Sequence, residues 1–267
     1  MICDIRKAFL NIGVAKTNQD ALRFLWVDDP FKADPSIVSY RFTRVMFGLN
    51  CSPFLLNGTL RHHLMKFSSQ HEEMIPLILR SLYVDDFTGG AEDVEKSIEL
   101  YRLLIQVLEV GGFPVHKFVT NNTELQTIIN SDSGTEPKIE VKVLGSPWNT
   151  ESDTISIALG VEIESGGTLT KRVIASVLMR IFDPLGLVTP IVMPIKLMLQ
   201  KAWVLNLDWD TSLSDEIADC WQAWCESLKK TSEFRIPRCY ITETPVNCKL
   251  IGFCDASTKA FAAVVYL

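Results

Sequence analysis

The sequence predicts a mixed α+β fold in which a small antiparallel sheet is backed by helices. Two patterns support this prediction. Short strand-like runs alternate with stretches such as residues 94–110, where apolar side chains recur at helical spacing. Asp85 and Asp86 lie between an apolar run at 75–82 and the pair Gly89-Gly90, which is typical of a hairpin tip. With 267 residues and 47% apolar content, the chain can bury a large core as one domain or two.

The first half of the chain carries most of the strand signals. Residues 1–14 begin as a strand that carries Asp4, residues 17–26 resemble a short helix, and residues 37–45 alternate between polar and apolar side chains. Ser52 is a good N-cap and Pro53 suits the first helical position, so we expect a helix from residue 52. Asp93 is expected to cap the helix at 94–110.

The second half is expected to be mostly helical. Residues 121–138 are polar and are interpreted as a surface loop, and two short strands at 142–145 and 154–157 are expected to join through a turn at Trp148-Asn149. A second module is expected from about Gly167, with a final strand from Leu250. Its predicted helices are 170–181 with Thr170 as the cap, 194–203, and 214–229.

The charge and the cysteine content of the chain indicate which partners and which cellular environment to expect. The net charge of −6 weakly disfavours a nucleic-acid binder, because phosphate contacts come from Lys and Arg. Seven cysteines without a Cys-x-x-Cys pair indicate free thiols in a reducing, intracellular environment. The sequence has no signal peptide and no apolar run of about 18 residues, so we expect a soluble chain with no membrane partner.

The chemistry predicted from the residues alone rests on three carboxylates. If the strand carrying Asp4 neighbours the hairpin with Asp85 and Asp86, these side chains converge at one sheet edge. Hard divalent cations such as Mg²⁺ prefer oxygen ligands, and two of them can assist displacement at phosphorus. The plainer interpretation of Asp85-Asp86 is a surface turn.

Several motifs resemble those of reverse transcriptases. Tyr83-Val84-Asp85-Asp86 matches their Tyr-x-Asp-Asp box, and residues 4–9 (Asp-Ile-Arg-Lys-Ala-Phe) are similar to the first palm motif. Residues 42–53 resemble the motif in which a Gly turn and Ser-Pro open a palm helix. Residues 111–117 are similar to the motif that follows the box, and Val143-Leu144-Gly145 resembles the primer-grip hairpin. Five motifs in the right order form a specific pattern.

Two further stretches resemble the Pol polyprotein of BEL/Pao long-terminal-repeat retrotransposons. These are residues 47–54 and the run Phe-Asp-Pro-Leu-Gly-Leu at 182–187. Residues 253–257 (Phe-Cys-Asp-Ala-Ser) resemble the first strand of a ribonuclease H domain. The resemblance implies a palm with partial fingers and primer-grip hairpin at 1–165, a helical thumb or connection at 166–245, and a truncated ribonuclease H-like start at 246–267. Both termini fall inside strand-like runs, so we expect a piece of a longer polyprotein.

The resemblance also implies roles for individual residues. Metal ligation is expected from Asp4, Asp85 and Asp86, holding two Mg²⁺ ions for which Mn²⁺ could substitute. Lys117 would donate a proton to the leaving pyrophosphate. The remaining expected roles are nucleotide binding by Phe9, Phe47, Gly48 and Tyr83, primer grip by Leu144 and Gly145, and a ribonuclease H carboxylate at Asp255 whose partner acids would lie after residue 267. Without the resemblance, Phe9 is more simply a core residue.

The implied activity is RNA-directed DNA polymerisation. Its partners would be an RNA or DNA template with primer, deoxynucleoside triphosphates and the remainder of the Pol polyprotein, with a cytoplasmic particle as the expected location. The chain departs from retroviral relatives in having Phe47 where they have Gln, and we expect it to lack the fingers region that would precede Asp4 in the family. The alternatives are a catalytically silent remnant that at most binds nucleic acid, and a metal-dependent phosphatase or nuclease.

Overall fold

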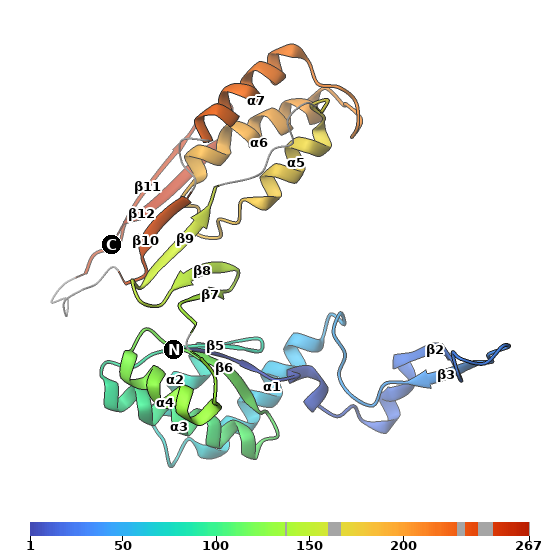
Figure 1. Ribbon diagram of the computed structural model, residues 1–267, viewed down its shortest axis with the longest axis vertical. Helices are drawn as coiled ribbons and strands as arrows, with labels where there is room; N and C mark the ends of the chain where they lie inside the picture. Colours follow the sequence, from blue (N-terminus) through green and yellow to red (C-terminus); the bar gives the residue numbers. More distant parts are fainter. Residues whose placement is uncertain (137, 160–166, 229–232, 240–247, 267) are drawn as a thin grey trace. The chain divides into compact units, whose positions relative to one another are not determined.

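The computed structural model describes residues 1–136, 138–159, 167–228, 233–239 and 248–266. The chain divides into two compact units, Met1–Pro137 and Lys138–Leu267 (Figure 1). The sequence analysis expected the first boundary after residue 165. The units instead divide before the predicted primer-grip hairpin, which therefore belongs to the second unit.

A four-stranded antiparallel sheet forms the centre of the first unit, in the order β4-β5-β1-β6. Its two inner strands are β1 (Ile2–Ile5) and β5 (Asp86–Thr88), and its edge strands are β4 (Leu82–Tyr83) and β6 (Val115–Val119). Together with the helices around it, this sheet confirms the prediction of an α+β fold.

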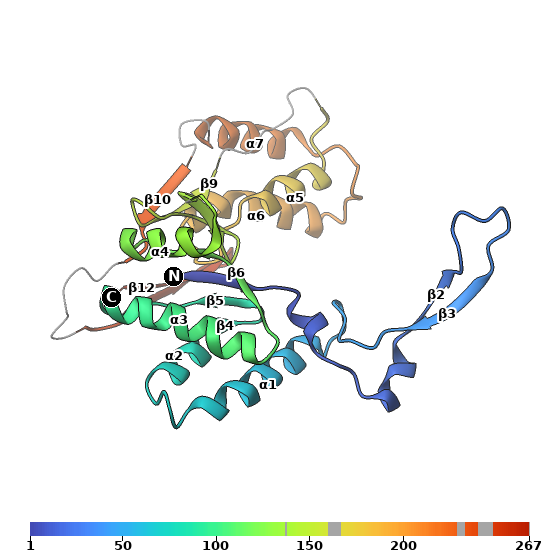
Figure 2. The same ribbon diagram turned by 60° about the horizontal axis from the view of Figure 1, so that its bottom comes forward.

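The helices cover one face of this sheet. Side chains alternate between faces along a strand, so Cys3, Ile5 and Phe87 point to one side and become buried. Helices α1 (Ser52–Leu64), α2 (Met74–Ser81) and α3 (Val94–Val110) pack on that side, as Figures 1 and 2 show. The opposite face carries the polar side chains of the same strands.

Two helices of the first unit were not predicted. The apolar run at 75–82 forms α2, so only Leu82 and Tyr83 enter the strand before the hairpin. The polar stretch after residue 121 forms α4 (Thr123–Ser133), whose Leu125 and Ile129 are buried against Tyr101. The expected cap of α1 was also wrong, because Ser52 is the first helical residue and its hydroxyl donates to the Met46 carbonyl.

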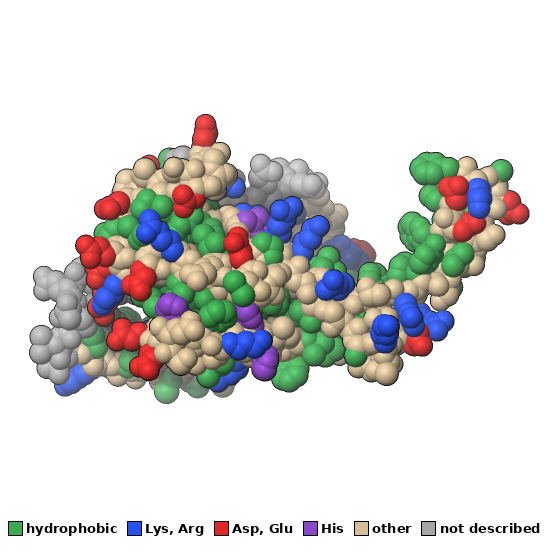
Figure 3. All heavy atoms as spheres, turned by 90° about the horizontal axis from the view of Figure 1, so that it is seen from below, with side chains coloured by type: hydrophobic (Ala, Val, Ile, Leu, Met, Phe, Trp, Pro, Cys, Tyr) green, Lys and Arg blue, Asp and Glu red, His purple; other side chains and the backbone are tan. Residues whose placement is uncertain are grey.

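A hairpin arm formed by β2 (Arg23–Val27) and β3 (Ile37–Arg41) projects from the first unit (Figure 2). It begins after two 3₁₀ turns, Ala8–Asn11 and Lys16–Leu22, so the helix expected at 17–26 is only partly helical and ends as a strand. Hydrophobic side chains remain uncovered along this arm, as Figure 3 shows. Among them are Leu25, Trp26 and Ile37.

The second unit contains a sheet in the order β10-β9-β8-β7. The turn expected at Trp148-Asn149 was wrong, because β8 (Ser146–Asn149) includes both residues and pairs with β7 (Glu140–Val143) through a two-residue turn at Leu144-Gly145. Strand β9 (Thr154–Ala158) continues the sheet, and β10 (Glu233–Pro237) pairs with it from much later in the chain.

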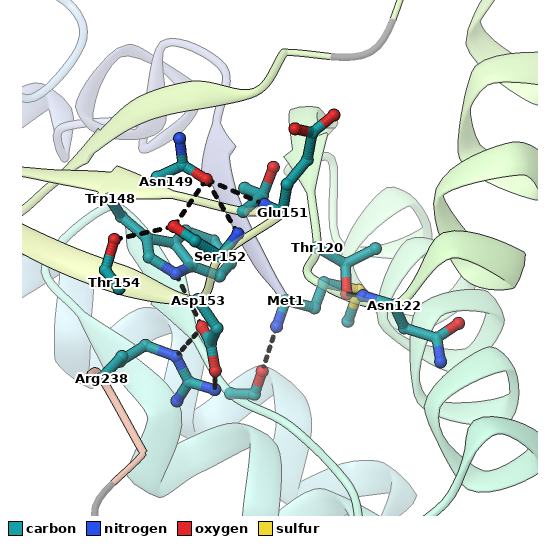
Figure 4. Close-up of polar contacts among 12 residues, drawn as sticks. Met1, Thr120, Asn122, Trp148, Asn149, Glu151, Ser152, Asp153, Thr154 and Arg238 are labelled. Atoms are coloured by element: carbon teal, nitrogen blue, oxygen red, sulfur yellow. Dashed lines mark hydrogen bonds and ion pairs between the residues drawn. The ribbon is translucent and has the colours of Figure 1, made fainter.

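A polar network of Trp148, Asp153 and Arg238 lies at one end of this sheet. The Asp153 carboxylate accepts hydrogen bonds from the Trp148 indole at 2.9 Å and from Arg238 Nε and Nη2 at 2.7 and 2.8 Å (Figure 4). The Arg238 backbone N–H also donates to the Asp153 carbonyl. The network therefore ties the β8–β9 turn to the end of β10.

Three helices and a two-stranded sheet complete the second unit. Helix α5 (Lys171–Arg180) is capped by Thr170, as predicted, while α6 (Thr189–Val204) begins before the expected residue 194. Helix α7 (Asp215–Leu228) buries Trp221 and Trp224 in the core shared by the three helices. Strands β11 (Ile251–Ala256) and β12 (Phe261–Tyr266) pair with each other. Within the described residues, none of the helices combines the length and apolar character that crossing a membrane requires.

Candidate functional site

Two of the three predicted carboxylates, Asp4 and Asp86, face each other on the sheet of the first unit. In the antiparallel pairing of β1 with β5, Asp4 lies directly opposite Asp86, and residues that face each other in such a pair project to the same side. Cys3 and Ile5 are buried on the helix side, so Asp4 and Asp86 occupy the opposite face. Two carboxylates that are distant in the sequence are therefore neighbours.

Asp85 lies in the turn that joins β4 to β5. Tyr83 pairs with Asp86, which leaves Val84 and Asp85 as a two-residue loop. Val84 has φ of 57°, a left-handed conformation that is sterically costly for a β-branched residue. The Asp85 carbonyl accepts from the Ile5 N–H at 2.8 Å, which holds this turn against the end of β1.

A β-bulge brings Lys117 to the same place. Between the pairs Ile2–Val119 and Asp4–His116, strand β6 contains one more residue than β1. Lys117 lies in this bulge with φ of 58°, and its Nζ donates to Asp4 Oδ2 at 2.7 Å. In a regular strand, Lys117 would point to the face opposite to that of His116, towards the helices. The bulge therefore directs its ammonium group to the carboxylates.

The electrostatics of the site reflect crowded negative charge. Burial, and then the nearby charges of Asp85 and Asp4, raise the pKa of Asp86 above its ordinary value, while Lys117 partly opposes this change. Burial, followed by the Asp4 charge, also raises the pKa of the Cys3 thiol. A cation on this face of the sheet would relieve the repulsion between the carboxylates.

The donor set suits a hard divalent ion. Mg²⁺ is usually held by one or two carboxylates and completes its coordination with water and substrate phosphates, so the facing pair Asp4 and Asp86 fits it. The ammonium of Lys117 already neutralises Asp4, which indicates that positive charge is favourable there. Among the described residues, no three His, Cys, Asp or Glu side chains gather as a ready metal-binding group.

The residues predicted to contact a nucleotide have contrasting environments. Phe9 is buried in the core and makes an edge-on contact with Phe47, their ring centroids 4.8 Å apart. Phe47 and Tyr83 are both more than half exposed. Gly48 has φ of 85°, a conformation that glycine adopts without steric cost.

The predicted primer-grip residues form the β7–β8 turn of the second unit. Leu144 and Gly145 both have positive φ, at 48° and 92°, as in the tight turns that suit antiparallel hairpins. A Cβ added at Gly145 would lie 2.7 Å from the Phe182 ring, so a larger residue would be strained by the φ and would also require that ring to shift. Asp255, the predicted ribonuclease H carboxylate, is exposed on β11 opposite Ala262.

Two residues beside the carboxylates had no role in the sequence analysis. His116 donates from Nδ1 to the Asp4 carbonyl at 3.0 Å and lies opposite Asp4 in the sheet. Arg6 follows β1 two residues after Asp4, which places it on the same face. The strand alternation could have identified Arg6, whereas the pairing of His116 depends on the fold.

A family model matches part of the second unit. Residues 170–267 match the model of the Pao retrotransposon-like RNaseH-like domain, and this match supports a retrotransposon origin of the Pao kind. It starts at the cap of α5, well before residue 246, where the sequence analysis expected ribonuclease H-like sequence to begin. No curated protein matches the chain.

Proposed function

We propose that the first unit is the palm of a reverse transcriptase from a BEL/Pao-type retrotransposon Pol polyprotein, and that its activity is RNA-directed DNA polymerisation. The observation that carries the proposal is the arrangement around Asp4, which has Asp86 opposite it on one strand and Lys117 aimed at it from the other. The Pao-type match at 170–267 is consistent with the same polyprotein.

Asp4, Asp85 and Asp86 are the residues that would hold the divalent ions. When bound, such ions activate the primer hydroxyl and stabilise the charge that develops at phosphorus. Lys117 has two tasks in this proposal. Its ammonium neutralises Asp4 before substrates arrive, and it then donates a proton to the pyrophosphate leaving group.

The other residues of the site position the nucleotide. Gly48, with its positive φ, lets the backbone approach the base or sugar closely. The buried ring of Phe9 makes an edge-on contact with the exposed ring of Phe47 and holds it in place, so that the Phe47 ring can pack against the deoxyribose. The turn at Leu144-Gly145 would contact the primer strand. These contacts determine orientation, which supplies much of the catalysis in phosphoryl transfer.

Primer extension on an RNA template, with deoxynucleotides and Mg²⁺, tests the proposal. Asp4→Asn and Asp85→Asn should each abolish extension. Asp219→Asn is the matched control, because Asp219 is an exposed carboxylate of α7. Extension that persists in Asp85→Asn would refute the assignment of the site.

A second measurement separates the active enzyme from a silent remnant. Mn²⁺ binding, followed by the relaxation of water protons, should weaken at least about tenfold in Asp4→Asn and Asp86→Asn if both carboxylates ligate the ion. Carboxylate-dependent Mn²⁺ binding without any extension by the wild-type chain would favour the remnant.

A further inference from the structure

The hairpin arm of β2 and β3 has one face that is entirely apolar. The register pairs Phe24 with Tyr40 and Trp26 with Val38, and residues that face each other in an antiparallel pair project to the same side. Phe42 continues this face, because it follows Tyr40 by two positions and its ring centroid lies 4.7 Å from that of Phe24. We call this face the aromatic strip, and its members are Phe24, Trp26, Val38, Tyr40 and Phe42.

The aromatic strip is ordered within the arm but lacks a cover. The rings of Phe24 and Tyr40 stack with their centroids 5.7 Å apart. Trp26 is 60% exposed, and no member of the strip belongs to a hydrophobic core of the described residues. A two-stranded hairpin is at best marginally stable by itself in water, and contiguous exposed apolar patches mark interaction sites. A partner that covers the strip would therefore stabilise the arm.

The tip of the arm is acidic. Asp28, Asp29 and Asp34 lie in the loop between the two strands, where Lys32 is the single cation of the sequence. Lys32 Nζ pairs with Asp28 at 2.6 Å, and among the described residues neither Asp29 nor Asp34 has an ion-pair partner. This excess of negative charge would repel the phosphates of a nucleic-acid strand, so the arm favours a protein partner.

The base of the arm carries the opposite charge. Arg23 and Arg41 face each other across the two strands and share the single carboxylate of Asp20, each at 3.0 Å. A strand rises about 3.3 Å per residue, so the base and the tip lie roughly 13 Å or more apart. That distance exceeds the Debye length of about 8 Å at physiological ionic strength. The two ends of one arm therefore do not neutralise each other.

We propose that the aromatic strip is an interface between two copies of this chain, whose arms pack face to face and antiparallel about a twofold axis. In this arrangement the acidic tip of each arm meets the basic base of the other, while the two strips cover each other. A second copy is the partner that fits, because one arm carries both halves of the charge match. The inference is independent of the polymerase function, since it involves neither a substrate nor the carboxylates of the site.

The first test measures self-association of the wild-type chain by sedimentation velocity from about 2 to 200 μM. A single strip is smaller than a standard interface, so we expect a weak dimer with a Kd in the micromolar range. Trp26→Glu places a carboxylate within the apolar contact and should raise the Kd at least about tenfold. Phe54→Glu is the matched control, because Phe54 is an exposed aromatic residue of α1, and it should change the Kd less than about twofold.

The second test reverses the charges at the two ends of the arm. Asp29→Lys/Asp34→Lys makes the tip basic, and Asp20→Lys/Arg23→Glu/Arg41→Glu makes the base acidic while it keeps the internal ion pairs with opposite signs. Each variant alone brings like charges together at both ends, so it should dimerise at least about tenfold more weakly than the wild type. In an equimolar mixture, opposite charges meet at both ends again. The mixed dimer, followed with a fluorescent label on one variant, should therefore recover an affinity close to that of the wild type.

Several results would overturn the proposal. These are a wild-type chain that stays monomeric over the whole concentration range, a dimer that Trp26→Glu leaves unchanged or that Phe54→Glu weakens equally, and a mixture of the two charge variants that associates no better than either alone. A monomeric wild type whose binding of single-stranded oligo-dT is lost in Trp26→Glu would assign the strip to a nucleic-acid strand instead. The unfolding temperature of each variant verifies that it is folded.

Discussion

Replacing Asp153 should destabilise the second unit by an amount that can be worked out from its contacts. Asp153→Asn keeps the side-chain volume and tolerates the φ of 49° at this position, but it places an amide donor against one nitrogen of Arg238. A hydrogen bond to a charged group contributes about 1.5–3 kcal/mol. Arg238 and Asp153 are 43% and 26% exposed, so screening by solvent reduces the expected cost to about 1–2 kcal/mol.

Asp153→Ala should cost more, for two additional reasons. The indole N–H of Trp148, whose side chain is buried, would lose its acceptor at a cost of about 1–3 kcal/mol. Alanine would also adopt a left-handed conformation, which costs roughly 1 kcal/mol more. We therefore expect a total of about 3–6 kcal/mol, which is a large part of the stability of a typical domain.

Urea unfolding followed by tryptophan fluorescence measures these differences. Five of the six tryptophans lie in residues 138–267, so the signal reports mainly on the second unit. Asp210→Asn is the matched control, because Asp210 binds Arg172 at the same two distances of 2.7 and 2.8 Å. The side chains of Asp210 and Arg172 are 72% and 62% exposed, so solvent screens this pair and its loss should change stability much less than the loss of Asp153. Equal effects of Asp153→Asn and Asp210→Asn would refute the reasoning.

Three further predictions concern single positions. Asp86→Asn should raise the melting temperature at pH 7 by about 1–3 °C, because the raised pKa of Asp86 means that its ionisation opposes folding. In the wild type, stability is highest when the Asp86 carboxyl is protonated and falls as pH rises through its folded-state pKa. The higher melting temperature of Asp86→Asn should therefore vanish below about pH 4, where the wild-type carboxyl is protonated. A difference in melting temperature that persists there would contradict the assignment. The Tyr101 hydroxyl donates to Asp132, and burial followed by the Asp132 charge raises the pKa of Tyr101 to about 12. The wild type should therefore lose stability between about pH 10 and 12. Tyr101→Phe should lose less stability over that range, as measured by denaturant titrations. Gly145→Ala should destabilise the second unit by about 1–3 kcal/mol in thermal unfolding, and a background of Phe182→Ala should remove only the steric part of that cost, because the φ of 92° remains; complete rescue would show that the conformation is not strained.

The sequence predicted those elements whose signals are local. Helix α3 begins at Val94 because Asp93 accepts from the Lys96 N–H, and both the cap and the apolar spacing can be recognised in the sequence. The cap at Thr170 is similar. By contrast, the run at 75–82 was expected to be a strand and mostly forms a helix. The prediction failed because a short apolar stretch has no periodicity that separates helix from strand.

The local signal was present but misinterpreted at two other places. Asn122 caps α4, with Leu125 and Ile129 four residues apart on its buried side, although the stretch is polar on average. The hairpin turn lies at Leu144-Gly145, where the glycine could have indicated it. Trp148 lies in a strand instead, with its ring buried and its indole N–H donating to Asp153. In both cases the position of individual residues mattered more than the average composition.

The geometry of the candidate site could not have been predicted from spacing. Asp4 and Lys117 are 113 residues apart, and the contact between them depends on a bulge that inserts one residue into β6. Sequence motifs identified both residues as site members, but nothing in the sequence indicates which strand would bulge. The fold therefore supplies the pairing, and the motifs supply the residue types.

Backbone strain links the predicted motifs to one another. Among the described residues, six that are not glycine have positive φ. Asp153 and Asn206 are types that tolerate this conformation, and Asp153 has a structural network to explain it. The other four are Lys7, Val84, Lys117 and Leu144, which are poorly suited to it and all lie in motifs that resemble those of reverse transcriptases. Each costs of order 1 kcal/mol or more, and glycine would avoid that cost. The presence of these four residues instead of glycine is best explained if the side chain, or the turn that it occupies, has a task that glycine cannot perform.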